Sequence, residues 1–76
     1  PKEAAMLRLL RQRAGRAVPR AEFLREVWGG SPFVGDRTID THMLNLRQKV
    51  EADCRRPQFL LTVHGVGYRL VEQPEA

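Results

Sequence analysis

Residues 36–53 carry polar side chains whose types suit the recognition of nucleic-acid bases. The amides of Asn45 and Gln48 can each donate one hydrogen bond and accept another, which matches the edge that adenine presents in the major groove. The methyl group of Thr41 can rest against the methyl group of thymine. Leu44 can do the same, although single exposed leucines without a role are common on surfaces. On a helix of about 100° per residue five side chains share one side, here called the polar face: Arg37, Thr41, Leu44, Asn45 and Gln48.

Charged side chains flank the polar face. His42 and Arg47 lie at its edges, where side chains can meet the phosphates on either side of a groove. Asp40 and Lys49 lie at the same edges. The alternative for these residues is a solvated helix surface with charge pairs one turn apart, such as Lys49 with Asp53.

The residue types argue against catalysis and metal binding. The only candidates for a nucleophile or a base are Cys54, His42 and His64, and they form no motif. Two histidines and one cysteine lack the spacing of zinc ligands, and a chain of 76 residues has little volume for a substrate cleft. We therefore expect no enzymatic activity, no metal and no cofactor.

The charge of the chain favours a polyanionic partner. Thirteen Lys and Arg against nine Asp and Glu give a formal net charge of +4. Residues 1–20 hold six basic groups and one acid, whereas the other residues hold seven basic groups and eight acids. The basic excess therefore lies outside residues 36–53. Net charge alone is thus weak support for nucleic-acid binding by this helix, and the support must come from the arrangement of its side chains.

The length and the absence of targeting signals limit the class of protein. A chain of 76 residues forms one domain with a small core. Its apolar runs are too short to cross a bilayer, so we expect no membrane contact. The start at Pro1 lacks the pattern of a secretory signal, and the single cysteine, Cys54, cannot form an internal disulfide. These features favour a reducing cytoplasm.

Two helices are expected ahead of the one that carries the polar face. The first covers residues 1–13 and ends at Gly15, which accepts a left-handed conformation. Its apolar positions are Ala5, Met6, Leu9 and Leu10. No residue precedes Pro1 to cap this helix, so we expect the chain to be a fragment of a longer one. A short extended stretch is possible at Ala17-Val18.

The second helix is expected over residues 20–28, and Gly29-Gly30 stops it. Its apolar positions are Phe23, Leu24, Val27 and Trp28, with Glu22 and Glu26 facing water. Residues 29–35 form a loop because three glycines and a proline disfavour helix and strand. We expect Phe33 and Val34 in this loop to pack down on the domain.

The third helix is expected to start at Asp36, as its N-cap, and to run to about residue 53. Its buried seam is Ile39, Met43, Leu46 and Val50. Two β-rich runs, 59–63 and 68–71, are joined by His64-Gly65-Val66-Gly67 and form a hairpin, here called the wing. The domain thus covers residues 1–71, and residues 72–76 form a flexible tail.

Four groups of residues, in fixed order and spacing, form a series: Pro1-Lys2-Glu3 with Leu9-Leu10; Val27-Trp28-Gly29; Asp36-Arg37-Thr38-Ile39-Asp40-Thr41-His42 with Leu46-Arg47; and Thr62-Val63-His64-Gly65-Val66-Gly67-Tyr68-Arg69. In these groups the chain resembles, from Pro1 to about Leu70, the C-terminal effector domain of OmpR/PhoB-type response regulators. The resemblance implies an α+β fold of the winged helix-turn-helix type. The family domain usually begins with a small antiparallel sheet ahead of the first helix, and this sequence lacks it.

The resemblance implies sequence-specific binding of double-stranded DNA, with helix 36–53 in the major groove. The expected base-reading residues are Thr41, Leu44, Asn45 and Gln48. The expected phosphate contacts are Arg20, Trp28, Arg37, His42, Arg47, Thr62 and Tyr68. The three of these on the third helix match positions that contact DNA in relatives. Trp28 can donate its indole N–H to a phosphate, and Arg20 stands at the positive end of a helix dipole. The two in the wing carry hydroxyls that suit phosphate oxygens.

His64 at the tip of the wing matches a position where relatives usually place an arginine in the minor groove. A neutral imidazole gains less from the negative potential of that groove than a guanidinium does, and DNA favours the protonated ring. We therefore expect weaker minor-groove anchoring than an arginine gives, and a steeper dependence of affinity on pH between about pH 6 and 8.

The resemblance also implies partners. It implies a transcription factor in a two-component system whose phosphorylated receiver domain, upstream, promotes head-to-tail homodimers on repeated DNA half-sites. The loop after the second helix resembles the segment that touches RNA polymerase in relatives. Its candidate residues are Gly30, Ser31, Pro32, Phe33 and Val34.

Two alternatives remain open at this stage. One is a winged helix that binds only protein, because a fold does not fix a function. Such a module shows no duplex binding even at low salt, whereas a DNA binder loses affinity steeply as salt rises. The other is the DNA-binding domain of a membrane-anchored one-component activator, which sequence flanking this chain would reveal.

Overall fold

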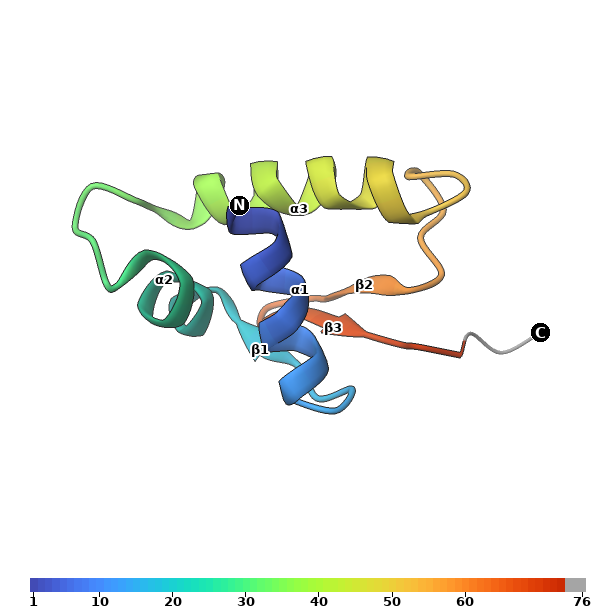
Figure 1. The fold of residues 1–76 in the computed structure, drawn as a ribbon, viewed down its shortest axis with the longest axis horizontal. Coiled ribbons are helices and arrows are strands. Elements are labelled where there is room, and N and C mark those ends of the chain that lie inside the picture. Colours follow the sequence, from blue (N-terminus) through green and yellow to red (C-terminus); the bar gives the residue numbers. More distant parts are fainter. Residues whose placement is uncertain (74–76) are drawn as a thin grey trace.

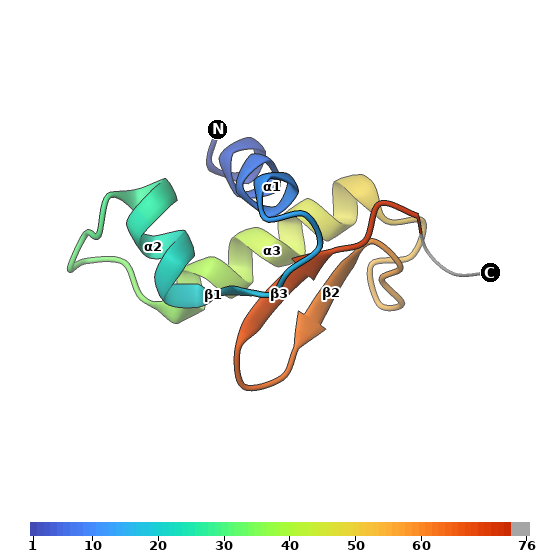
Figure 2. The same ribbon diagram turned by 90° about the horizontal axis from the view of Figure 1, so that it is seen from below.

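The computed structural model describes residues 1–73 as three helices and a small sheet (Figure 1). The elements, in chain order, are α1 (Lys2–Gln12), β1 (Val18–Pro19), α2 (Arg20–Trp28), α3 (Asp36–Val50), β2 (Leu60–Val63) and β3 (Gly67–Leu70). This is the expected α+β winged helix-turn-helix. The turn between β2 and β3 projects beyond the helices (Figure 2).

The core lies where the three helices meet the sheet. Each helix repeats apolar residues on one side only, so burying those sides leaves the opposite sides polar and exposed. The largest fully buried side chains come from every element except β3: Phe23, Met6, Leu10, Ile39, Met43, Leu60 and Val18. The core therefore fixes α3 with its polar face outward.

The sheet has the order β1-β3-β2, and both pairs of strands are antiparallel. The third strand expected near Ala17-Val18 is present at Val18–Pro19 and pairs with β3, with Val18 opposite Tyr68. A Cβ atom at Gly67 would overlap the carbonyl oxygen of Val18, so only glycine allows β1 to approach β3 there. The wing turn itself needs Gly65, whose φ is 77°.

The first two helices match their predicted ranges closely. Gly15 is left-handed, with a φ of 84°, as expected, but α1 ends earlier: its C-cap is Arg13, and Ala14 already has a φ of 53°. The bounds of α2 are those predicted, because Gly29 closes it in a left-handed conformation with a φ of 66°. The prediction for Glu22 was wrong, because its half-buried carboxylate accepts a hydrogen bond from Arg13.

The structure corrects both ends of α3. Its N-cap is Gly35, and Asp36 is the first helical residue and makes no side-chain capping bond. The helix ends at Val50 and not near residue 53, because Glu51 adopts an extended conformation with a ψ of 145°. Val50 is 40% exposed, so the buried seam stops at Leu46.

The prediction that Phe33 packs down on the domain was wrong. Its side chain is 94% exposed, whereas Val34 is half-buried. The loop turns locally, with the backbone N–H of Phe33 donating to the hydroxyl of Ser31 at 3.2 Å, and this turn directs Phe33 away from the core.

The tail predicted over residues 72–76 falls partly outside the described residues, which end at residue 73. Within them, Glu72 accepts a hydrogen bond from Arg11 at 3.1 Å. No helix among residues 1–73 is long and apolar enough to span a membrane.

Candidate nucleic-acid interface

The polar face of α3 is exposed along its whole length. All five of its residues are accessible, including Leu44, which is 49% exposed. The hydroxyl of Thr41 donates to the carbonyl oxygen of Arg37 at 3.0 Å, so its hydrogen is used within the helix and its methyl group remains available. The face thus offers apolar groups at Thr41 and Leu44 beside amides at Asn45 and Gln48.

Asp40 links α3 to α2 and to the wing. Its Oδ1 accepts hydrogen bonds from Nε of Arg20 at 2.8 Å and from the hydroxyl of Tyr68 at 2.5 Å. Partial burial acts to raise the pKa of Asp40, but these two bonds outweigh it and the pKa lies below its ordinary value. The same bond to Asp40 raises the pKa of Arg20. The pair is therefore charged at neutral pH.

Tyr68 is buried between cationic side chains. It is 5% exposed, and its ring centroid lies 5.2 Å from Cζ of Arg20 and 5.4 Å from Cζ of Arg47. Burial, followed by the hydrogen bond to Asp40, raises the pKa of Tyr68. Its hydroxyl, which was predicted to contact a phosphate, donates its hydrogen bond to Asp40 instead.

Arg47 joins α3 to β2. Its Nε donates to the carbonyl oxygen of Leu60 at 3.0 Å, and its Nη2 donates to the hydroxyl of Thr62 at 2.8 Å. Two residues that were predicted separately as phosphate contacts thus touch each other. The contact fixes the direction of the wing relative to α3.

His42 and Trp28 form a second junction, where α3 meets α1 and α2. Their ring centroids lie 5.2 Å apart. Nδ1 of His42 lies 2.5 Å from the carboxylate of Glu3, which also accepts a hydrogen bond from Lys49 at 3.3 Å. The pair of Lys49 with Asp53, given as an example of the alternative, does not form, because α3 ends before Asp53 and Asp53 pairs with Arg55.

The remaining predicted residues lie in the wing turn and in the loop between α2 and α3. His64 is exposed in the wing turn, next to Val66, which is 42% exposed. The loop from Gly30 to Val34 stands apart from the wing, at the junction of α2 and α3 (Figure 1). The structure therefore gathers Arg20, Arg47, Thr62 and Tyr68 into one cluster and leaves His64 and the loop separate.

Sequence reasoning missed the roles of Glu3 and Asp40. The place of Glu3, three residues before buried Met6 and seven before buried Leu10, indicates an inward position. Asp40 was placed among phosphate-facing side chains, although a carboxylate is repelled by phosphate. Both carboxylates instead hold cations of the interface.

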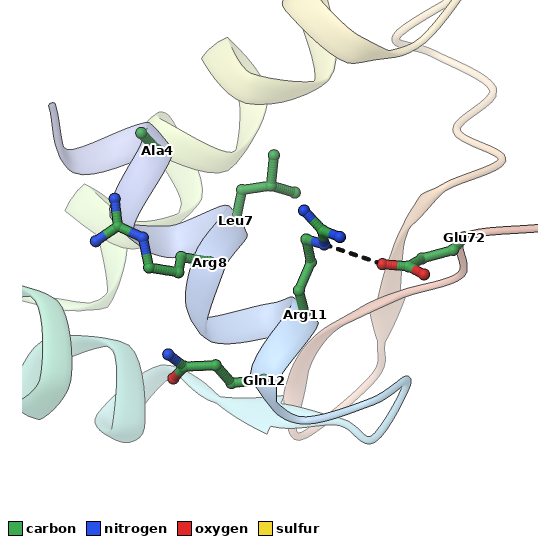
Figure 3. A pocket seen from close by; sticks show the side chains of 6 residues that line it. All are labelled: Ala4, Leu7, Arg8, Arg11, Gln12 and Glu72. Carbon is green, nitrogen blue, oxygen red and sulfur yellow. Dashed lines mark hydrogen bonds and ion pairs between the residues drawn. The ribbon is translucent and has the colours of Figure 1, made fainter.

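A groove on the outer side of α1 lies away from this interface (Figure 3). Its lining residues are Ala4, Leu7, Arg8, Arg11, Gln12 and Glu72. An ion pair between Arg11 and Glu72 crosses it, and the lining holds no nucleophile. Among residues 1–73, no group of three His, Cys, Asp or Glu residues is placed to hold a metal ion.

Comparisons with known proteins agree with this geometry. The chain is 43% identical over 70 residues to the sensory transduction protein RegX3 of Mycobacterium tuberculosis, a match that covers 91% of this chain and 30% of RegX3. DrrB, an OmpR/PhoB homologue of Thermotoga maritima, superposes with a TM-score of 0.82 at 36% identity, over 91% of this chain and 31% of DrrB. The RstA DNA-binding domain of Klebsiella pneumoniae, solved in complex with the RstA box, gives a TM-score of 0.79 at 28% identity, over 91% of this chain and 68% of that one.

The chain spans about 30% of the length of RegX3, so it corresponds to one part of such a relative. A family model described as "Transcriptional regulatory protein, C terminal" matches residues 1–70. The motifs, the winged-helix topology and these matches cover the same residues. The chain therefore belongs to the family of transcriptional regulatory protein C-terminal domains, the OmpR/PhoB-type winged-helix domains of response regulators.

Proposed function

We propose that this chain binds double-stranded DNA sequence-specifically, with α3 in the major groove and the wing at the minor groove. The observation that carries the proposal is the exposed polar face of α3, with Arg20 and Arg47 held on one flank and His42 and Lys49 on the other. The RstA domain, which shares the fold, was solved with DNA. An α-helix fits the width of the major groove and can present such a face to base edges.

Base readout is assigned to the middle of the polar face. Thr41 and Leu44 are three residues apart and offer apolar contacts to thymine methyl groups. Asn45 and Gln48 are also three residues apart and offer bidentate hydrogen bonds to adenines. The exposure of all four side chains supports this assignment.

Phosphate contacts are assigned to Arg37, at the start of the polar face, and to side chains beside that face: Arg20, Trp28, His42, Arg47 and Thr62. Arg20 uses only Nε on Asp40, and Arg47 uses Nε and Nη2 within the domain, so both keep guanidinium N–H groups for phosphates. The buried hydroxyl of Tyr68 favours a supporting role through Asp40 in place of a direct contact. His64 is assigned to the minor groove.

The wider role is that of an effector domain in a two-component regulator of the bacterial cytoplasm. We further propose homodimers on repeated half-sites, driven by an upstream receiver domain, and contact with RNA polymerase through Gly30, Ser31, Pro32, Phe33 and Val34. The name of RegX3, a sensory transduction protein, and its greater length support the first point. The exposure of Phe33 supports the last, since a phenyl ring at 94% exposure is suited to burial against a partner.

The test is selection of bound duplexes from a random pool, followed by titration of the selected duplex at rising salt. We expect a consensus site and a log–log slope of about −0.9 for each phosphate neutralised. Arg37→Gln should reduce that slope by about 0.9, whereas Arg8→Gln, an equal change of charge on the outer side of α1, should leave it nearly unchanged. Absence of duplex binding at low salt would favour a protein-only module.

A further inference from the structure

The imidazole of His42 is held in place from α1. Its Nδ1 lies 2.5 Å from Oε2 of Glu3, which is 39 residues earlier in the chain. Lys49, on the same side of α3, donates to the other oxygen of Glu3 at 3.3 Å. The hydrogen bond from His42 is the main cause of a lowered pKa of Glu3, although burial opposes it. Glu3 is therefore an ionised carboxylate that occupies one ring nitrogen.

The other groups near His42 in the described part of the chain do not engage Nε2, its second ring nitrogen. The indole of Trp28, from α2, covers the imidazole, and Nζ of Lys2 lies 5.6 Å from the indole ring centroid. The charged groups around His42 are thus Glu3 directly, Lys49 behind Glu3, and Lys2 across the indole. Within residues 1–73, Nε2 of His42 makes no hydrogen bond.

This arrangement restricts the protonation states that can meet a phosphate. A neutral imidazole that donates from Nδ1 to a carboxylate has a bare Nε2, which is an acceptor and repels a phosphate oxygen. Only the imidazolium form donates from both nitrogens. A phosphate contact at Nε2 therefore requires the imidazolium form of the ring.

We propose that Glu3 is a positioning residue of the DNA interface, which fixes the ring of His42 through Nδ1 so that the duplex binds the imidazolium form, in which Nε2 donates to a phosphate. The inference rests on the proposed DNA binding. It adds a role for Glu3 of α1 and the protonation state of His42 in the bound complex. Because the bound state holds the extra proton, affinity rises as pH falls, by at most about tenfold per pH unit.

The test is calorimetric titration of the selected duplex in two buffers of different ionisation enthalpy, between about pH 6 and 9. Every protein carries His64→Gln, which removes the titrating ring of the wing. We expect proton uptake that passes through a maximum within this range and is abolished by His42→Gln. Glu3→Gln, which preserves the size of the side chain, should reduce the peak by more than half. Lys49→Gln, the matched control, removes the other partner of Glu3 and should retain the uptake while affinity falls.

Other outcomes separate this inference from the function on which it rests. Tight duplex binding with no proton uptake, or with uptake unchanged by His42→Gln or Glu3→Gln, would overturn the inference and leave DNA binding standing. Failure to select any duplex would overturn the proposed function itself. If Glu3→Gln does not fold, Glu3→Asp, which retracts the carboxylate by one methylene, must also reduce the uptake.

Discussion

Asp40 connects three elements. It belongs to α3, and its carboxylate accepts hydrogen bonds from Arg20 of α2 and from Tyr68 of β3. The cations around it keep it ionised, and it in turn fixes Arg20 beside the polar face. An anion inside a DNA interface is explained by this positioning role, because it orders a cation that would otherwise lose side-chain entropy on binding.

Replacement of Asp40 by Asn tests this role. The free energy of unfolding at pH 7 should fall by about 0.5–1.5 kcal/mol, because the bond from Arg20 loses its charge assistance and the site is partly exposed. A double-mutant cycle with Arg20→Gln, followed by urea unfolding, should show coupling between the two. Asp53→Asn, which removes an exposed ion pair with Arg55, is the control and should change little. Additive effects of Arg20→Gln and Asp40→Asn would contradict the account.

His64 is tested by substitution with arginine. Between about pH 6 and 8 the wild-type chain should bind duplex more tightly as the pH falls, because the protonated ring suits the minor groove. His64→Arg should bind more tightly at pH 8 and depend less on pH. Equal affinity of the two proteins across this range, measured by fluorescence anisotropy, would remove His64 from the interface.

At this scale the sequence predicts which side chains are exposed better than it predicts their partners. The polar face follows from the helical period alone, so its five residues could be assigned without a structure. The partner of His42 lies 39 residues away, and no local pattern encodes that contact. The buried state of Tyr68 likewise depends on the pairing of β3 with β1.

The C-terminal end of α3 is set by backbone groups that lie seven to nine residues further along the chain. The carboxylate of Glu51 accepts backbone N–H bonds from Gln58, Phe59 and Leu60, which joins the end of α3 to the start of β2. The helix signal continues past Val50 in the sequence, but these bonds draw Glu51 into an extended conformation. By contrast, α2 ends at two adjacent glycines, a local signal, and its bounds were predicted correctly.

Glu51→Gln tests the junction between α3 and β2. Burial acts to raise the pKa of Glu51, but its backbone N–H donors outweigh burial and the pKa is lowered from the ordinary 4.5. The stabilisation is therefore present above about pH 4.5 and is lost as the pH falls through the lower folded value. At pH 7 the variant should lose about 1–3 kcal/mol of unfolding free energy.

Thermal melting at several pH values checks both the size of the stability loss in Glu51→Gln and the direction of its change with pH. The difference in melting temperature between wild type and Glu51→Gln should shrink as the pH is lowered below 4.5. Glu26→Gln, at an exposed position on α2, is the control. A difference that persists undiminished at low pH would mean that the carboxylate charge does not support this junction.

For the whole molecule, the fold separates two surfaces. The core holds the polar face of α3 outward, while the loop between α2 and α3 lies at one end of the domain (Figures 1 and 2). Phe33, in this loop, is almost fully exposed. The sequence predicted the loop but not this exposure, because an aromatic residue in a small domain usually adds to the core. An exposed phenyl ring suggests burial against a partner.

Phe33→Ser should leave folding and duplex affinity unchanged, because the side chain contributes almost no buried surface. It should weaken the binding of RNA polymerase to the protein on its duplex, measured by a mobility shift of the ternary complex. Pro32→Ser, in the same loop, is the control for a general effect of the loop. Loss of duplex affinity in Phe33→Ser would place the loop in the DNA interface instead.

The central claim, that the polar face of α3 reads bases, has one direct measurement: the ratio of the dissociation constants for the selected duplex and for duplexes with single substituted base pairs. Asn45→Ala and Gln48→Ala should each lower discrimination at a different base pair, by about 1–3 kcal/mol, because each removes a bidentate hydrogen-bonding side chain. Gln12→Ala, an exposed amide on α1, should lower none. If neither substitution on α3 changes affinity or preference at any base pair, the face does not read bases and the account is contradicted.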